Sequence, residues 1–178
     1  LISKGHTVIG TGRRQEKLDE LQTQLGDNFI PLNFDVSDLP ATKTALQTLP
    51  SHVLNNLDVL VNNAGLALGL EPADKTDFAD WQQMVNTNIL GLIHLTHEIL
   101  PFMVANNDGY IINLSSTAGN YPYFGGNVYG ATKAFVTQFS LNLRADLVGK
   151  NIRVSNIEPG LCGGTEFSNI RFHGDDAK

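Results

Sequence analysis

The sequence predicts an α/β fold in which helices connect the strands of a doubly wound parallel sheet. Short runs rich in β-branched residues alternate with longer segments whose apolar residues recur about every 3.6 positions. This alternation is typical of right-handed βαβ units, because each helix returns the chain so that the next strand runs parallel to the last. We therefore expect three layers, with helices on both faces of the sheet.

The expected elements follow one another without a linker or an internal repeat, so one domain is predicted over residues 1–178. Strands are expected at His6–Thr11, Phe29–Phe34, Asp58–Asn62, Tyr110–Ser115 and Ile152–Ile157. Helices are expected at Gln15–Leu25, Leu39–Leu49, Phe78–Ala105 and Val128–Val148. Glycine and asparagine turns at 26–28, 106–109 and 149–151 return the chain to the next strand.

The composition favours a cytoplasmic protein that binds a small molecule and no metal. Of 178 residues, 42% are hydrophobic and 17% charged, and the net charge of -6 argues against binding to nucleic acids or anionic membranes. The single cysteine, Cys162, cannot form an internal disulfide, and no Cys/His cluster has metal-ligand spacing. No run approaches the roughly 20 uninterrupted apolar residues that span a bilayer, and none resembles a signal peptide.

The strongest functional signal is the pair Tyr129 and Lys133, with Ser116 thirteen positions before the tyrosine. Residues four apart share a helix face, so the phenol and the amine can reach the same ligand. We expect the lysine cation to lower the tyrosine pKa toward a value useful for acid or base catalysis. Ser116 would follow a strand at the carboxyl edge of the sheet, where its hydroxyl could bind a substrate oxygen. Taken alone, a Tyr-x-x-x-Lys pair could be incidental on a helix surface.

Three further signals occur in a fixed order around this pair. Asn-Asn-Ala-Gly at 62–65 follows a predicted strand, Asn88 lies in the next helix, and Pro159-Gly160 follows the last strand. In this order the sequence resembles the short-chain dehydrogenase/reductase family across essentially all 178 residues. The resemblance implies a Rossmann-type fold and an oxidoreductase whose bound nicotinamide transfers the hydride.

The resemblance also implies the roles of the site residues. Tyr129 is the acid or base, Ser116 orients the substrate, Lys133 modulates the tyrosine and binds the nicotinamide ribose, and Asn88 anchors a proton-relay water. Asn63 is the expected cofactor contact of the loop after the third strand. The alternative for Asn62 is a purely structural role in bracing that loop. The cofactor residues implied in this part of the chain are Asn63, Ala64, Gly65, Tyr129, Lys133, Pro159, Gly160, Leu161, Gly163 and Thr165.

The residues after the first predicted strand favour NADP(H) over NAD(H). Enzymes that use NAD usually place a carboxylate there for the ribose hydroxyls, whereas Gly12 is followed by Arg13 and Arg14, which suit a 2'-phosphate. The alternative is two solvated arginines at a helix start. By resemblance Asp35 and Val36 contact the adenine, although Asp35 could simply cap a turn.

The substrate is expected from the segments around 125–127 and 158–176. Both look like those of the family branch that oxidises serine, allo-threonine and related 3-hydroxy acids. Arg171 could pair with a substrate carboxylate, and a surface arginine without that role is the alternative. Reduction of another carbonyl, such as a 3-oxoacyl thioester, and a catalytically silent dinucleotide-binding protein are the competing hypotheses. The family resemblance implies a homotetramer.

The chain is expected to lack the first strand, which carries the family's glycine-rich phosphate loop, and the C-terminal strand. No such loop motif occurs in the sequence, and Leu1–Lys4 are interpreted as the end of a helix that stops at Gly5. In the family's strand order the missing strand lies at the centre of the sheet, so the sheet should be divided.

We expect residues 1–178 alone to be poorly folded and inactive, while the parent protein is active. Strand edges left unpaired expose backbone groups that cost about 1 to 3 kcal/mol each when buried without a partner. Thermal unfolding followed by circular dichroism, together with an assay of NADPH turnover, tests this. A cooperative melt and turnover by the isolated chain would contradict it.

Overall fold

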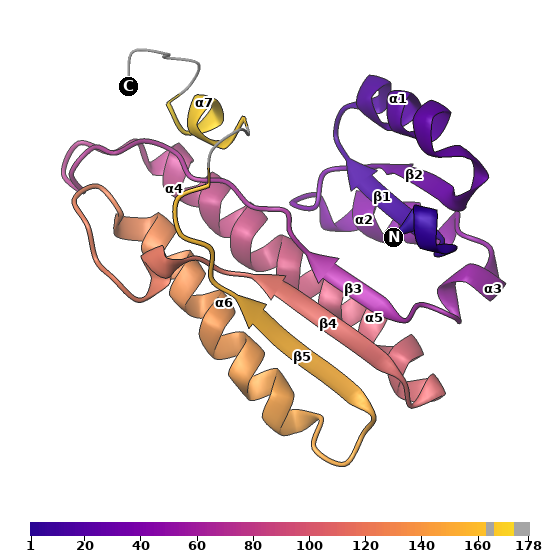
Figure 1. The fold of residues 1–178 in the computed structure, drawn as a ribbon. Coiled ribbons are helices and arrows are strands. Elements are labelled where there is room, and N and C mark those ends of the chain that lie inside the picture. Colours follow the sequence, from indigo (N-terminus) through magenta and orange to yellow (C-terminus); the bar gives the residue numbers. More distant parts are fainter. Residues whose placement is uncertain (163–165, 173–178) are drawn as a thin grey trace. The chain divides into compact units, whose positions relative to one another are not determined.

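The computed structural model describes residues 1–162 and 166–172. By their contacts these residues form two compact units, Leu1–Pro50 and Ser51–Lys178, which are described separately (Figure 1). The described strands form two parallel sheets, of two and three strands. The α/β class and the divided sheet expected from the sequence are therefore confirmed.

The first unit is a two-stranded sheet with two helices. β1 (Val8–Gly12) pairs with β2 (Phe29–Asn33), and α1 (Gln15–Leu25) connects them. α2 (Leu39–Gln47) follows β2, and 3-10 turns at Ile2–Lys4 and Gly26–Asn28 precede the two strands. Gly10 accepts no side chain, because a Cβ there would lie 2.4 Å from the Phe29 ring.

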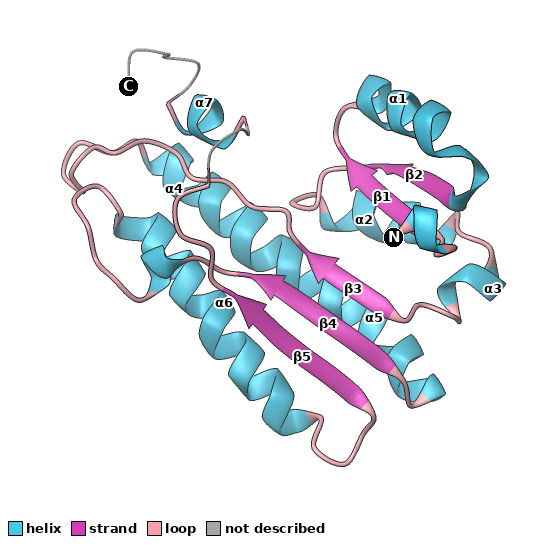
Figure 2. Ribbon diagram, in the orientation of Figure 1, coloured by secondary structure: helices cyan, strands magenta, loops and turns pink. Residues whose placement is uncertain are grey.

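The second unit is a three-stranded sheet in the order β3 (Val59–Asn62), β4 (Gly109–Leu114), β5 (Ile152–Ile157). Two long helices, α5 (Leu92–Asn106) and α6 (Asn127–Asp146), pack against it (Figure 2). α4 (Phe78–Val85) packs against α6. The remaining elements are α3 (Ser51–Leu54), a 3-10 turn at Thr117–Gly119 and α7 (Phe167–Arg171).

Buried amides fix both long helices to one face of this sheet. Asn62 on β3 donates to Thr96 of α5 (2.9 Å) and to Asn113, its register partner on β4 (2.8 Å). Asn113 donates to Ser140 of α6 (2.9 Å). Val59 and Val61 alternate with these side chains and are about half exposed. Within the described part of this unit, α5 and α6 thus cover a single face of the sheet.

Eight of the nine expected elements are found with bounds that agree to within two residues. The turns also follow the prediction, since Gly5, Gly26, Asn107 and Gly149 all have positive φ. The helix expected at Phe78–Ala105 differs, because Asn86–Gly91 forms a π-helical turn between α4 and α5. A π-helical turn contains an additional residue, and apolar periodicity does not reveal it. Such turns are often found at functional sites.

The helical run Phe78–Asn106 is long and apolar enough, by length and composition, to cross a membrane. Two polar residues of this run contact other parts of the second unit. Asn88 and Thr96 within it are buried and hydrogen-bonded to the Leu66 backbone and to Asn62. Through these two residues the run is thus packed into the second unit.

Candidate active site

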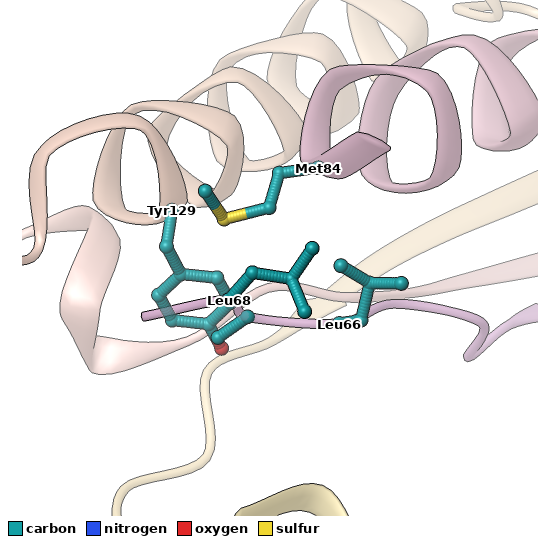
Figure 3. Packing of buried hydrophobic residues seen from close by; sticks show 5 residues of the cluster. Leu66, Leu68, Met84 and Tyr129 are labelled. Atoms are coloured by element: carbon teal, nitrogen blue, oxygen red, sulfur yellow. The ribbon is translucent and has the colours of Figure 1, made fainter. Parts of the chain in front are cut away.

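Tyr129 lies in the first turn of α6 and is only 8% exposed. Its ring belongs to a buried apolar cluster with Leu66, Ala67, Leu68 and Met84. Figure 3 shows the ring beside Leu68, with the phenol oxygen at the end away from Met84. Burial of the ring therefore fixes where the hydroxyl can act.

Lys133 lies one helical turn after Tyr129 and is 6% exposed. Its Nζ donates to the carbonyl of Leu114 at the end of β4 (2.8 Å) and lies 5.9 Å from the centroid of the Tyr129 ring. Burial lowers the pKa of Lys133 to about 8, because desolvation disfavours the charged amine. The i, i+4 spacing therefore places both groups on one buried helix face, as predicted.

The expected lowering of the Tyr129 pKa by Lys133 is wrong. Burial raises the pKa of the phenol, and this effect outweighs the Ser116 hydroxyl and the Arg171 guanidinium, which act to lower it. Lys133 does not lower this pKa, because its amine donates to the Leu114 carbonyl and lies 5.9 Å from the centroid of the Tyr129 ring. In this structure Tyr129 is therefore a protonated phenol at neutral pH.

Asn88 is 1% exposed and links the π-helical turn to the loop after β3. Its Oδ1 accepts from the Leu66 amide (2.9 Å), and its Nδ2 donates to the Leu66 carbonyl (2.8 Å) and to Thr132 of α6 (3.0 Å). A Cβ on Gly65 would lie 3.2 Å from Nζ of Lys133 and 3.3 Å from Oδ1 of Asn88. Asn88 and Lys133 therefore both lie next to Gly65, and the three motifs that contain these residues are close together in the fold.

Ser116 follows β4, and its hydroxyl lies beside the Tyr129 phenol, whose pKa it acts to lower. Its Oγ accepts from the Ala118 amide (3.2 Å) and donates to the carbonyl of Pro159 (3.4 Å). The serine thus joins the carboxyl ends of β4 and β5, where parallel α/β sheets bind ligands.

The sequence analysis missed a polar network that supports these groups. Ser115 donates to the main-chain carbonyl of Lys133 (2.6 Å) and contacts the Thr137 hydroxyl (3.0 Å). Glu158 accepts from Thr137 (2.9 Å) and from Asn156 (2.8 Å). This network ties the residue before Pro159 to the helix that bears Tyr129 and Lys133, and only the adjacency of Glu158 to Pro159 could have suggested it.

The expected cofactor residues of the second unit differ in exposure. Asn62 is buried within the sheet and braces it, whereas Asn63 and Ala64 are exposed. Pro159 is half-buried, and Gly160 and Leu161 are exposed. Nothing lies within 4 Å of a Cβ placed on Gly160, and Gly65 leaves room above Lys133. These exposed loops beside a buried amine fit a dinucleotide; Gly163 and Thr165 lie outside the described residues.

The expected cofactor residues of the first unit follow its two strands. Arg13 lies after β1 and pairs with Asp35 (3.5 Å), while Arg14 is the N-cap residue of α1. Burial acts to raise the pKa of Asp35, but hydrogen bonds from Ser37 and the charge of Arg13 hold it below its usual value. Asp35 thus does cap a turn, and Val36 beside it is half-buried. The exposed guanidinium of Arg13 fits a phosphate group.

Arg171 lies at the end of α7, close to Tyr129. Its Nε donates to the Gly69 carbonyl (3.2 Å), and its guanidinium carbon lies 5.7 Å from the centroid of the Tyr129 ring. The ring of Phe167, also on α7, lies 6.0 Å from that of Tyr129. Arg171 is therefore half-buried next to the phenol, which argues against an isolated surface arginine.

A buried phenol, a strand-end hydroxyl and a buried amine on a parallel α/β sheet define an oxidoreductase that acts on alcohols or carbonyls. Sequence comparison agrees, since the short chain dehydrogenase family profile matches residues 1–175, and the chain belongs to that family. Among the described residues, no group of three His, Cys, Asp or Glu could hold a metal ion.

Three relatives illustrate the likeness. A Haemophilus influenzae protein named "Probable NADP-dependent dehydrogenase" is 67% identical over 178 residues, which are 100% of this chain and 70% of the relative. The NADP-dependent 3-hydroxy acid dehydrogenase of Escherichia coli strain K12 is 59% identical over 177 residues, covering 99% and 71%. The solved closed form of serine dehydrogenase complexed with NADP+ has a TM-score of 0.96 at 59% identity, covering 99% and 71%.

Replacing Lys133 should change how stability depends on pH. The folded pKa is lowered from 10.5 to about 8, so between these values the unfolded chain binds a proton that the folded chain does not. The cost of burying the charged amine is therefore fully present below pH 8 and disappears as pH rises toward 10.5. We expect cofactor-free Lys133→Met to be more stable than the wild type at pH 7, by up to about 3 kcal/mol, and to lose this advantage near pH 10.5.

Urea unfolding of the full-length protein across this pH range measures the effect. Lys150→Met is the matched control, because Lys150 is exposed in the turn before β5. A Lys133→Met advantage that stays constant with pH would show that the buried amine does not titrate in this window.

Proposed function

We propose that the chain forms part of an NADP(H)-dependent dehydrogenase that oxidises the hydroxyl of a small 3-hydroxy acid such as serine or allo-threonine. The main supporting observation is the position of Arg171, whose guanidinium lies 5.7 Å from the Tyr129 ring. A proton-transfer group beside a cation suits a substrate that has both a reacting hydroxyl and a carboxylate. Relatives named 3-hydroxy acid dehydrogenase and serine 3-dehydrogenase share 59% and 53% identity with this chain.

The side chains divide the work of proton transfer. Ser116 orients the substrate oxygen, and Tyr129 takes its proton during oxidation or donates one during carbonyl reduction. Tyr129 is protonated at neutral pH, so it can donate a proton during reduction. Burial raises its pKa, so the phenolate that acts as base during oxidation becomes more populated only as pH rises. Asn88 holds the Leu66 backbone beside the site and anchors the relay water, while Lys133 binds the nicotinamide ribose. When bound, the nicotinamide takes or gives the hydride.

NADP(H) is favoured by the two arginines after β1. Arg13 and Arg14 would form charge-assisted hydrogen bonds with the 2'-phosphate, and no carboxylate at Gly12 competes for the ribose hydroxyls. Asp35 and Val36 would contact the adenine. Asn63 to Gly65 and Pro159 to Leu161 would contact the remainder of the cofactor. By the family resemblance Gly163 and Thr165, which lie outside the described residues, would also contact it.

We further infer a single dinucleotide-binding domain, a homotetramer and a cytoplasmic location. The family resemblance supports the tetramer, and α6 offers apolar surface for contacts, since Phe135 and Leu141 are more than a third exposed. Cys162 is exposed and has no disulfide, which suits a reducing compartment.

Steady-state kinetics with the full-length protein test this function. We expect serine and allo-threonine to be oxidised with NADP, and Arg13→Ala with Arg14→Ala to raise KM for NADP by tenfold or more while KM for NAD changes little. Lys17→Ala is the matched control, because this exposed lysine on α1 pairs only with Glu20 among the described residues.

Two results would contradict the proposal. Equal use of NAD and NADP by the wild-type protein would remove the role of the arginines. Turnover of a 3-oxoacyl thioester with none of the hydroxy acids would assign the site to the competing reductase function.

A further inference from the structure

Tyr123 lies six positions before Tyr129, in the loop that precedes α6. Its phenol oxygen accepts a hydrogen bond from Nη2 of Arg171 (2.9 Å). The guanidinium carbon of Arg171 lies 5.5 Å from the centroid of the Tyr123 ring and 5.7 Å from that of the Tyr129 ring. One cation is therefore shared by two tyrosines, of which one is the proposed acid or base.

The loop around Tyr123 is shaped to hold its ring in place. A Cβ on Gly126 would lie 2.6 Å from a ring carbon of Tyr123, so only glycine leaves room for the ring. Gly125 has a φ of 74°, and a Cβ there would lie 2.2 Å from the Leu70 carbonyl. The Gly126 amide also donates to the Tyr123 carbonyl (3.0 Å). The glycine pair thus has a physical reason, which is close packing of Tyr123 and its loop.

Gly69 also holds Arg171 in place. The Gly69 carbonyl accepts from Nε of Arg171 (3.2 Å), and the Gly69 amide donates to the Arg171 carbonyl (2.9 Å). An arginine has five N–H donors, of which two bind Gly69 and Tyr123. The other three N–H groups of Arg171, and the hydroxyl hydrogen of Tyr123, have no acceptor in the described part of the chain, from which the side chain of Ser168 is excluded. Two neighbouring side chains therefore present unused donors beside Tyr129.

We propose that Tyr123 determines substrate specificity by binding, together with Arg171, the carboxylate of the 3-hydroxy acid. This inference rests on the proposed function and names a second group for the same substrate. A carboxylate has two oxygens, so one can accept from the guanidinium and the other from the phenol. Besides burial and Ser116, both Tyr123 and Arg171 influence the pKa of Tyr129, so both lie within electrostatic reach of the reacting hydroxyl.

The test compares serine with serinamide, in which a neutral amide replaces the carboxylate. In the full-length enzyme, Tyr123→Phe should lower kcat/KM for serine by tenfold or more, the usual effect of one hydrogen bond to a charged group. The same change should leave kcat/KM for serinamide and KM for NADP within about twofold. Tyr121→Phe is the matched control, because Tyr121 lies in the same loop and is 72% exposed; it should alter neither substrate.

Three outcomes would overturn the proposal. An unchanged KM for serine in Tyr123→Phe would show that the Tyr123 hydroxyl does not bind the carboxylate. Equal losses with serine and serinamide would mean that Tyr123 only packs the site. A raised KM for NADP would show that the pair binds a cofactor phosphate instead.

A double-mutant cycle with Arg171→Ala tests whether the two residues act as a pair. If both bind one carboxylate, Tyr123→Phe should have little further effect once Arg171 is removed. Losses that simply multiply would show independent roles and contradict the proposed pair.

Binding of propionate separates failure of this inference from failure of the proposed function. Propionate has the carboxylate but no hydroxyl to oxidise, so its affinity for the NADP-loaded enzyme does not depend on turnover. Weaker binding to Tyr123→Phe than to the wild type would support the anion site even if serine proved not to be a substrate. Equal binding to both would refute the site even if serine were oxidised.

Discussion

The site depends on the burial of one face of α6 against the loop that follows β3. Tyr129 and Lys133 share that face, and the loop is fixed by both ends of the Asn88 amide, which bond to the Leu66 backbone. Because the phenol is desolvated, its pKa is raised. Because the amine is desolvated, its pKa falls to about 8. The same packing thus orients both groups and shifts the pKa of each.

The cation that influences the pKa of Tyr129 is not the one that the motif spacing suggests. The motif suggests that Lys133 stabilises the phenolate, whereas Arg171 on α7 is the cation that acts to lower the tyrosine pKa. Arg171 lies 42 positions after Tyr129, and hydrogen bonds from its side chain and its carbonyl to the Gly69 backbone hold it in place. A residue that binds the substrate would then also tune the proton-transfer group, so substrate binding and acid strength are linked.

The fold was largely predictable because its signals are local. Apolar periodicity located the strands and helices to within two residues, and glycine or asparagine at positive φ marked the turns. The π-helical turn at Asn86–Gly91 was missed, because the extra residue leaves no gap in the apolar pattern. In the site, the Tyr129, Lys133 and Ser116 cluster followed from spacing and order.

Other parts of the site depend on contacts between distant residues, which no local pattern encodes. The bond between Tyr123 and Arg171 spans 48 positions, and the network of Glu158, Thr137 and Ser115 joins two strand ends to α6. The direction of the Tyr129 pKa shift could not be predicted from the sequence either. Burial raises this pKa, Ser116 and Arg171 act to lower it, and only the folded structure shows which effect is larger.

The most direct test of the account is hydride transfer by Tyr129→Phe in the full-length enzyme. Phenylalanine keeps the ring that packs with Leu68 and Met84 and removes only the hydroxyl. We expect serine oxidation to fall by about 10² to 10⁴ in kcat, while the dissociation constant for NADPH stays within about threefold. Turnover close to that of the wild type would show that the proton leaves by another route, and would contradict the central role of this buried phenol.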